Sequence, residues 1–465
     1  MKKIIFYDLE TTGRSAYWDQ IIQIAAICTD EHLNVIDEMN LIGKLNSFSI
    51  PDPEALLVNK IPIDSIYKSN FSNYSLVSEI SHKFSEWSPA IFIGYNSIKF
   101  DEEVIRNAFF KNLFDPYLTV KNNNTRVDLL DITRIANFLY PEKIKSLLNK
   151  KGSAILKLES IAHTNGIKNF TAHDAMGDTY ASLELAKLIK KQIPELWDKS
   201  ILQSNKVQLE ASIASKPFCY LESFFGKSKL FCLSFVGFHP KYKWALCFDL
   251  FEDPKKVLEM NKSEIYTFLE NSPKKIRKIK LNKSPILLDI KIKKNLEEYN
   301  IVSYDTLLER HNFISNNQEF KEKILSCYED IITDESQLDI YAEESIYKKF
   351  ISNSDSYLMK EFQIADWKNK LIIMKKFTDE RLKYFAELLV FEEQPHLLER
   401  KNFLKIKEHF KNRIMSTNKE KWLTIFEAYK KIDDLRVKYD NNKENLFILE
   451  NVNKYIENLE KKFNT

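Results

Sequence analysis

Four carboxylates and one histidine have the residue types and spacing to bind metal and activate water. Asp8 and Glu10 lie in YDLETTG, Asp101 follows IGYNSIKF, and His173 and Asp178 lie in HDAMGD. One intervening residue on a strand places Asp8 and Glu10 on the same face. Two carboxylates on a hydrophobic strand are costly to bury without a counter-charge, and oxygen ligands favour magnesium or manganese. We therefore expect the four acids to surround divalent metal ions, with His173 beside them.

The elements that must position these residues follow from hydrophobic periodicity and β-branched runs. Strands are predicted at 2–8, 21–29, 34–45 and 90–94, and helices at 76–87, 101–111, 131–139 and 175–191. Asp101 would open one helix and Asp178 would lie in the first turn of another. Strands first and helices later, with a strand between helices, indicate an α/β domain of about 190 residues.

The pattern changes after Pro194. Short strand-like runs occur at 218–223, 229–236, 243–250 and 280–290, and they indicate a smaller β-rich domain. From about residue 355 the spacing is helical, and residues 422–463 are expected to form one or two long helices. The predicted domains are therefore 1–193, 194–350 and 351–465.

Composition limits the class of protein without identifying a partner. The chain has 465 residues and a formal net charge of +3, which neither requires nor excludes a nucleic-acid partner. Its five cysteines include no CxxC pair, so neither a disulfide framework nor a zinc site is expected. No apolar run approaches the ~20 residues that span a bilayer. We expect a soluble, cytoplasmic protein, with a monomer as the default.

The acids and the histidine resemble the DEDDh family of 3′→5′ exonucleases, which share a ribonuclease H-like fold. Within that family, the chain resembles the exodeoxyribonuclease I group through GYNSIKFDEEVIRNAFF (94–110), NTRVDLLDITR (124–134) and HDAMGDTYASLELAKLI (173–189). The resemblance is looser through FFGK (224–227) and LNKSPIL (281–287). It implies a ribonuclease H-like exonuclease domain, a central SH3-like domain and an all-helical C-terminal domain.

The resemblance also implies an activity and roles for the acids. Single-stranded DNA would be degraded to 5′-mononucleotides, in DNA repair and recombination, with two Mg²⁺ ions per site and Mn²⁺ as an alternative. Asp8 would bridge the ions, Glu10 and Asp178 would complete one site, and Asp101 would support the second. His173 would deprotonate the attacking water. A docking partner is implied too, the acidic C-terminal tail of a single-stranded-DNA-binding protein.

Substrate contacts are expected from a further set of residues. Glu10 and the backbone of Thr11 would hold the terminal 3′-hydroxyl, by analogy with the family. Arg106, Tyr117 and Lys157 are the candidates for gripping the strand. Tyr117 could equally be a packing residue, and Lys157 stands where the family tends to have an arginine, which loses the bidentate fork. The run at 274–283 (KKIRKIKLNK) could line a DNA channel or form a solvated strand face.

Two other functions compete with this interpretation. An RNA-directed DEDDh exonuclease would share the catalytic acids, but such proteins usually resemble only the catalytic domain. A non-catalytic nucleic-acid-binding scaffold would be expected to have lost an acid or the histidine, and none is lost here. The sequence GKS at 226–228 is not a phosphate-binding loop, because Leu221 stands where the first glycine is required.

Overall fold

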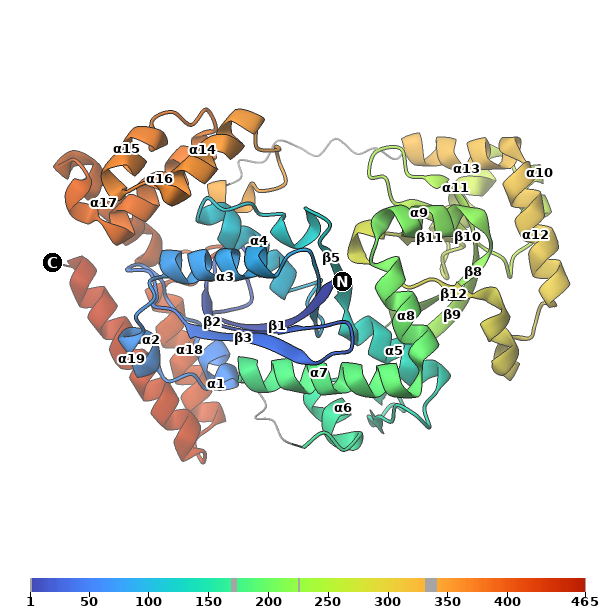
Figure 1. Ribbon diagram of the computed structural model, residues 1–465, viewed down its shortest axis with the longest axis horizontal. Helices are drawn as coiled ribbons and strands as arrows, with labels where there is room; N and C mark the ends of the chain where they lie inside the picture. The colour runs from blue at the N-terminus through green and yellow to red at the C-terminus, as the bar shows by residue number, and fades with distance from the viewer. Residues whose placement is uncertain (1, 169–173, 225, 331–340, 465) are drawn as a thin grey trace. The chain divides into compact units, whose positions relative to one another are not determined.

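The computed structural model describes residues 2–168, 174–224, 226–330 and 341–464. The chain divides into two compact units. Unit 1 comprises residues 1–125, 169–183 and 339–465, and unit 2 comprises residues 126–168 and 184–338. The division falls within one strand, β5 (Thr125–Asp128), and within one helix, α7 (Ala175–Gln192). Figure 1 shows the elements along the chain.

A five-stranded sheet carries the acidic strand. Its strands are β1 (Lys3–Thr11), β2 (Ile21–Thr29), β3 (Val35–Ile42), β4 (Ala90–Gly94) and β5, in the order β3-β2-β1-β4-β5. The β1–β2 and β2–β3 pairs are antiparallel, whereas β1 and β4 are parallel. Every residue of β2 and β4 is buried, as expected for strands that are covered on both faces.

Helices cover both faces of this sheet (Figure 1). The helices of this region are α1 (Pro53–Asn59), α2 (Ile63–Lys68), α3 (Asn73–Trp87), α4 (Asp101–Lys111) and α7. On one face, apolar residues of α3 and α4 pack against β1, β2 and β4 in a core that includes Tyr7, Phe84 and Phe109. On the other face, Thr179 of α7 donates a hydrogen bond to the carbonyl of Ala25 in β2.

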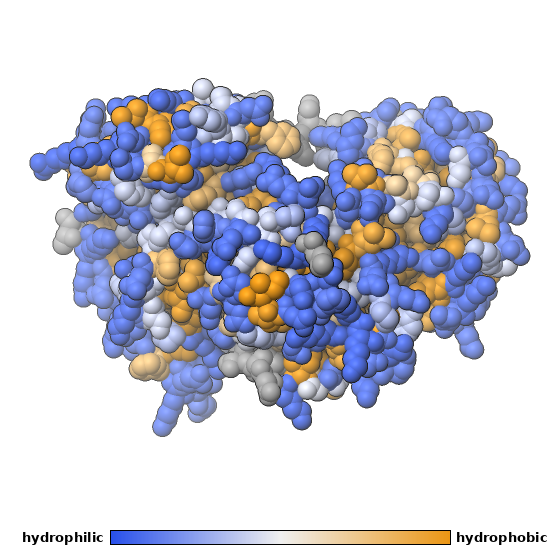
Figure 2. Space-filling model, viewed as in Figure 1, coloured by the Kyte–Doolittle hydropathy of each residue, from blue (hydrophilic) through white to orange (hydrophobic). Residues whose placement is uncertain are grey.

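Unit 1 also contains the helical C-terminal segment. Its helices are α14 (Asn353–Ile364), α15 (Trp367–Met374), α16 (Glu380–Glu393), α17 (Arg400–Ile414), α18 (Ile425–Lys438) and α19 (Lys443–Asn464). Phe410 of α17 stacks on Phe48 with ring centroids 3.6 Å apart, and Lys431 of α18 pairs with Asp52 at 2.6 Å. Figure 2 shows hydrophobic groups over α14 and α15, where Ile364 and Ile372 are exposed.

Unit 2 is built around a second five-stranded sheet. Its strands are β8 (Phe218–Phe224), β9 (Lys227–Phe238), β10 (Ala245–Asp249), β11 (Ile276–Ile279) and β12 (Leu288–Asp289), in the order β11-β10-β9-β8-β12. The helices are α5 (Leu129–Leu139), α6 (Leu158–Thr164), α8 (Pro194–Gln203), α9 (Lys206–Ser215), α10 (Pro254–Glu259), α11 (Lys262–Glu270), α12 (Tyr304–Asn316) and α13 (Gln318–Asp330). A short hairpin, β6 (Leu147–Leu148) with β7 (Ala154–Ile155), completes it.

The predicted fold class is confirmed, and some predicted elements are wrong. The strand predicted at 280–290 is wrong, because β11 ends at Ile279 and only Leu288 and Asp289 pair again. Pro285 lies in that run and lacks the N–H that a ladder needs. Helices α12 and α13 occupy residues of the expected β-rich domain. The predicted domain boundaries stay predictions. No helix within the described ranges is long and apolar enough to cross a membrane.

Candidate functional site

The acidic strand β1 presents its two carboxylates on one face. Tyr7 and Leu9 are buried in the core on the opposite face, and Asp8 and Glu10 alternate with them as partly buried residues. In the antiparallel register, Asp8 pairs with Ala25 and Glu10 pairs with Gln23 on β2. The period of two therefore places both carboxylates together, as the sequence predicts.

Asp101 is positioned by the turn between β4 and α4. Gly94 ends β4 where a Cβ atom would lie 2.9 Å from the carbonyl oxygen of Tyr7 and 2.5 Å from Cβ of Ser97. Only glycine allows the chain to turn this close to the acidic strand. Asp101 is then the first residue of α4 and is buried. At the first residue of a helix, a carboxylate is stabilised by the helix dipole.

Asp178 is positioned by the anchored first turn of α7. The N–H of Asp178 donates to the carbonyl of Asp174 at 2.9 Å, and the N–H of Gly177 donates to the Asp174 carboxylate at 3.2 Å. The other Asp174 oxygen accepts from Nε2 of Gln23 at 3.2 Å. Because Gln23 is the register partner of Glu10, this contact fixes the start of α7 to β2 beside the acidic strand.

The structure brings three of the predicted ligands into one cluster. Carboxylate oxygens of Asp8, Glu10 and Asp178 lie within 4.8 Å of one another. Burial, followed by the charges of Asp101, Glu10 and Asp178, raises the pKa of Asp8 well above its usual range. Burial, followed by the charges of Asp178, Asp101 and Asp174, raises the pKa of Glu10 to about 8. The charge of Asp101 thus raises the pKa of both carboxylates on β1, although Asp101 is not one of the three residues whose oxygens lie within 4.8 Å of one another.

This cluster fits a hard divalent cation. All of its donor atoms are carboxylate oxygens, which Mg²⁺, Mn²⁺ and Ca²⁺ prefer over softer metals. Burial first, and then repulsion among the carboxylates, disfavours their ionised forms, and the positive charge of a bound cation would offset both effects. The arrangement can therefore hold divalent metal on one face of the middle strand β1, near its C-terminal end.

The structure places the predicted substrate-binding residues in different settings. Thr11 is buried, and its hydroxyl donates to the carbonyl of Gly13 at 2.6 Å. Arg106 is also buried, in an ion pair with Glu102 at 2.8 Å, and its guanidinium lies 5.2 Å from the Tyr117 ring. Lys157 is exposed just before α6 in unit 2. His173 lies outside the described residues.

Sequence reasoning missed the residues that hold Asp178 in place. Gln23 is buried, and its Nε2 also donates to Oδ1 of Asn40 at 3.0 Å, while its Oε1 has no hydrogen-bond partner in the described structure. The sequence did carry a signal, because Gln23 is the only amide or charged residue in the buried strand IIQIAAICT. A polar residue inside such a strand needs a partner. Asp174 stands in HDAMGD, directly after His173, and was assigned no role from the sequence.

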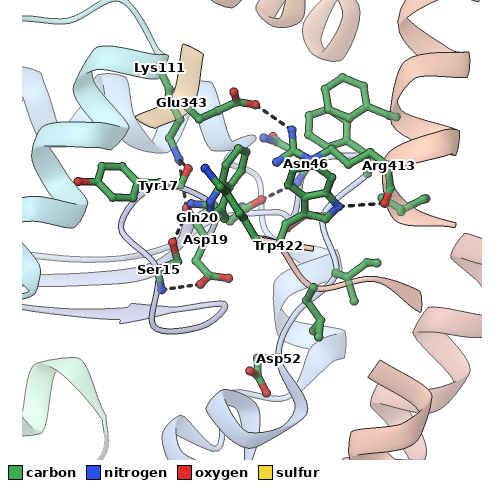
Figure 3. A pocket seen from close by; sticks show the side chains of 18 of the residues that line it. Ser15, Tyr17, Asp19, Gln20, Asn46, Asp52, Lys111, Glu343, Arg413 and Trp422 are labelled. Carbon is green, nitrogen blue, oxygen red and sulfur yellow. Dashed lines mark hydrogen bonds and ion pairs between the residues drawn. The ribbon is translucent and has the colours of Figure 1, made fainter. Parts of the chain in front are cut away.

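A large cavity of about 830 Å³ lies elsewhere in unit 1 (Figure 3). The β1–β2 loop and residues of α16–α18 line it, and none of the four predicted metal ligands does. Arg413 lies 4.4 Å from the rings of both Trp18 and Trp422, and Lys111 donates to the carbonyls of Tyr17 and Asp19. These contacts of Lys111 and Arg413 hold the loop between β1 and β2 in place. The cavity is separate from the metal cluster.

Comparisons with known proteins cover most of the chain. Residues 5–186 match the family described as Exonuclease, residues 204–330 the Exonuclease I SH3-like domain, and residues 340–459 the Exonuclease I C-terminal domain. Exodeoxyribonuclease I of Buchnera aphidicola subsp. Schizaphis graminum is 30% identical over 395 residues, which cover 82% of this chain and 80% of that protein.

Two solved structures show the same fold. Exonuclease I of E. coli in complex with a dA16 oligonucleotide has a TM-score of 0.86 and 24% identity, and the match covers 99% of this chain and 100% of that one. A structure of SSB/Exonuclease I in complex with the inhibitor CFAM has a TM-score of 0.83 and 24% identity, with the same coverage. The three-part architecture predicted from the sequence is therefore confirmed.

Proposed function

The chain belongs to the exodeoxyribonuclease I family, and we propose that it hydrolyses single-stranded DNA from the 3′ end to 5′-mononucleotides with metal held by Asp8, Glu10, Asp101 and Asp178. The observation that carries this proposal is the cluster of Asp8, Glu10 and Asp178, whose oxygens lie within 4.8 Å of one another. Family membership makes the protein a nuclease, and an exonuclease domain depends on divalent metal. The choice of Mg²⁺, with Mn²⁺ as the alternative, follows from the oxygen donors.

In this mechanism, bound divalent cations supply electrostatic stabilisation of the attacking and leaving oxygens in an in-line displacement. One metal position would be held by Asp8, Glu10 and Asp178, and the second would be supported by Asp101. Glu10 and the backbone at Thr11 hold the terminal 3′-hydroxyl, which gives specificity for a free end. These residues act by position and charge, and no covalent intermediate with the protein is needed.

His173 is proposed as the base that removes a proton from the attacking water. It directly precedes Asp174, whose carboxylate is held by Gln23 and by the N–H of Gly177. Asp174 also contributes to the raised pKa of Glu10. An imidazole with an ordinary pKa of about 6.5 accepts a proton at neutral pH.

The test is digestion of a 5′-labelled single-stranded DNA oligomer with Mg²⁺, beside matched RNA and duplex DNA. We expect stepwise shortening from the 3′ end that is lost with EDTA and in Asp178→Asn. The control is Asp64→Asn, an exposed carboxylate in α2 with a single 3.9 Å pair to Lys68, which should keep full activity. Preferential digestion of RNA would move the protein to the RNA-directed exonucleases. Tight binding without hydrolysis of any substrate would favour the scaffold.

The acidic C-terminal tail of a single-stranded-DNA-binding protein is the proposed protein partner, and the active form is proposed to be a monomer in the cytoplasm. The similarity to the SSB/Exonuclease I structure supports the first point. Titration calorimetry with a synthetic acidic tail peptide tests it, with a peptide of the same composition in scrambled order as the control. Light scattering of the purified full chain tests the monomer, and a stable dimer would contradict it.

A further inference from the structure

The C-terminal segment of unit 1 encloses one residue of the loop between β1 and β2, which comprises residues 12–20. The ring of Trp18 in this loop lies 5.1 Å from the Trp422 ring and 5.4 Å from the Tyr341 ring, in edge-to-face contacts. The guanidinium carbon of Arg413, in α17, lies 4.4 Å from the centres of both indole rings. We call Arg413, Trp422 and Tyr341 the Trp18 clamp. The clamp joins the loop after the acidic strand to a distant part of the chain.

Arg413 is held in a fixed orientation within the Trp18 clamp. Its guanidinium forms an ion pair with Glu343 at 2.8 Å, and both side chains are largely buried. The indole N–H of Trp422 donates to the carbonyl of Arg413 at 2.9 Å (Figure 3). The hydroxyl of Tyr384 donates to Glu343 at 3.2 Å. A planar guanidinium stacks on aromatic rings, and the attraction is stronger where water is excluded. The clamp is therefore ordered in the free protein and can hold Trp18 in one place.

A second contact fixes the same loop from the helix that carries Asp101. Nζ of Lys111, the last residue of α4, donates to the carbonyls of Tyr17 and Asp19 at 3.1 and 3.2 Å. Burial lowers the pKa of Lys111 to about 8, because the ammonium group loses water contacts, and the two carbonyls replace them. These carbonyls lie on both sides of Trp18 in the sequence. Since Asp101 is the first residue of the same helix, α4 links the position of the loop to that of a predicted metal ligand.

Hydrogen bonds within the loop connect Trp18 to the end of the acidic strand. The N–H of Thr12 donates to the carbonyl of Gln20 at 3.0 Å, and Oγ1 of Thr12 accepts from the N–H of Gln20 at 3.0 Å. The same hydroxyl donates to the carboxylate of Asp19 at 2.9 Å. Asp19 directly follows Trp18, and Thr12 directly follows Thr11, the last residue of β1. A displacement of Trp18 is therefore passed to Thr11 through two residues that are bonded to each other.

We propose that Trp18 and Arg413 are positioning residues for the hydrolysis. They fix the end of β1, and with it the metal ligand Glu10 and the backbone of Thr11. The inference rests on the proposed function, in which that backbone holds the terminal 3′-hydroxyl. Neither Trp18 nor Arg413 needs to touch DNA or metal for this role. Displacement of reacting groups by ~1 Å can lower a rate by roughly 100-fold. The C-terminal segment thus contributes to the rate through the loop between β1 and β2.

Steady-state hydrolysis of a 5′-labelled single-stranded DNA oligomer by the full chain tests the clamp. Trp18→Ala should lower kcat about tenfold, with a smaller change in KM, because misplaced reacting groups affect the chemical step. Trp18→Phe keeps a ring for Arg413 and should restore kcat to within about threefold of the native value. Arg413→Lys keeps the charge beside Glu343 but loses the planar group, and it should lower kcat while the protein stays folded.

The matched control is Ile456→Ala, which removes a fully buried side chain of α19 from the core that it shares with α1 and α18. This variant should lower Tm at least as much as Trp18→Ala does, because it leaves a cavity in that core. Its kcat should stay native at a temperature where all the variants are folded. An equal loss of kcat in Ile456→Ala, or native kcat in Trp18→Ala, would overturn the proposal and leave Trp18 a packing residue.

Calorimetric binding of Mn²⁺ without DNA separates this proposal from the proposed function. Trp18→Ala should weaken Mn²⁺ binding severalfold because Glu10 shifts, as is found when the outer partners of metal ligands are removed, and Ile456→Ala should not. Native protein that binds Mn²⁺ and hydrolyses no DNA would refute the proposed function. In that case, native Mn²⁺ affinity in Trp18→Ala would overturn the positioning role as well, whereas weakened binding in this variant alone would support the clamp's hold on Glu10.

Discussion

Binding of Mg²⁺ or Mn²⁺ to the acidic cluster should release protons, because the metal requires carboxylates that the free protein keeps partly protonated. The pKa of Glu10 is raised to about 8, and that of Asp8 is raised in the same direction. With a pKa of about 8, roughly 1% of Glu10 is ionised at pH 6 and about half at pH 8. Affinity should therefore increase about fifty-fold across this interval from Glu10 alone, which corresponds to ~2.3 kcal/mol.

The stability of the metal-free protein should change with pH in the opposite direction. The folded-state pKa of Glu10 lies above the ordinary value of 4.5, so the folded state holds a proton that the unfolded state has released. Stability therefore falls as pH rises from about 4.5 to 8, and Asp8 acts in the same sense. Thermal denaturation in EDTA should show a declining Tm over this range, and added Mg²⁺ should restore more stability at pH 8 than at pH 6.

Titration calorimetry in two buffers with different ionisation enthalpies measures the proton release directly. The native protein should release about one proton from Glu10 per binding event at pH 6.5, and Glu10→Gln should remove that share of the release. Asp64→Asn is again the matched control and should leave it unchanged. An affinity that is constant between pH 6 and 8, or a Glu10→Gln variant with the native pH slope, would refute the electrostatic reasoning.

Substitutions at three further positions test how the site is held in place. Gln23→Ala should lower metal affinity and kcat with a small change in Tm, because it releases Asp174 and the start of α7. Gln23→Glu should lower metal affinity and kcat further, because it adds a negative charge beside Asp174. Gly94→Ala should destabilise the protein by ~1–3 kcal/mol in urea denaturation, since its Cβ would overlap Ser97 and the Tyr7 carbonyl. Arg106→Ala should lower the free energy of unfolding by ~3–5 kcal/mol, because it leaves Glu102 buried without its ion-pair partner. A stable variant with weakened DNA binding would instead show that Arg106 contacts the substrate.

The sequence was most informative where a local pattern decides the structure. The alternation in β1 predicted that Asp8 and Glu10 share a face, and the strand at 90–94 and the helix at 101–111 have the predicted bounds. The role of Gln23 was not predictable in this way, because it depends on the β1–β2 register and on the position of α7, which lies about 150 residues later in the chain. Local sequence patterns predict which face of a strand or helix a residue lies on, whereas its contacts with distant residues depend on how the elements pack.

Arg106 shows how the same spacing supports two interpretations until burial is known. Glu102 and Arg106 are four residues apart on α4, which is the spacing of a helical ion pair, and this alternative to a DNA contact was visible in DEEVIRNAFF. The pair is buried, and Arg106 also lies 4.0 Å from Glu103.

The first turn of α4 thus carries three carboxylates, and Arg106 pairs with the second and lies near the third. Asp101, the first residue of the helix, is the acid of this turn whose charge raises the pKa of Asp8 and of Glu10, in addition to the larger effect of burial. Arg106, five residues beyond Asp101, therefore reduces the net negative charge that this turn places beside the acidic strand.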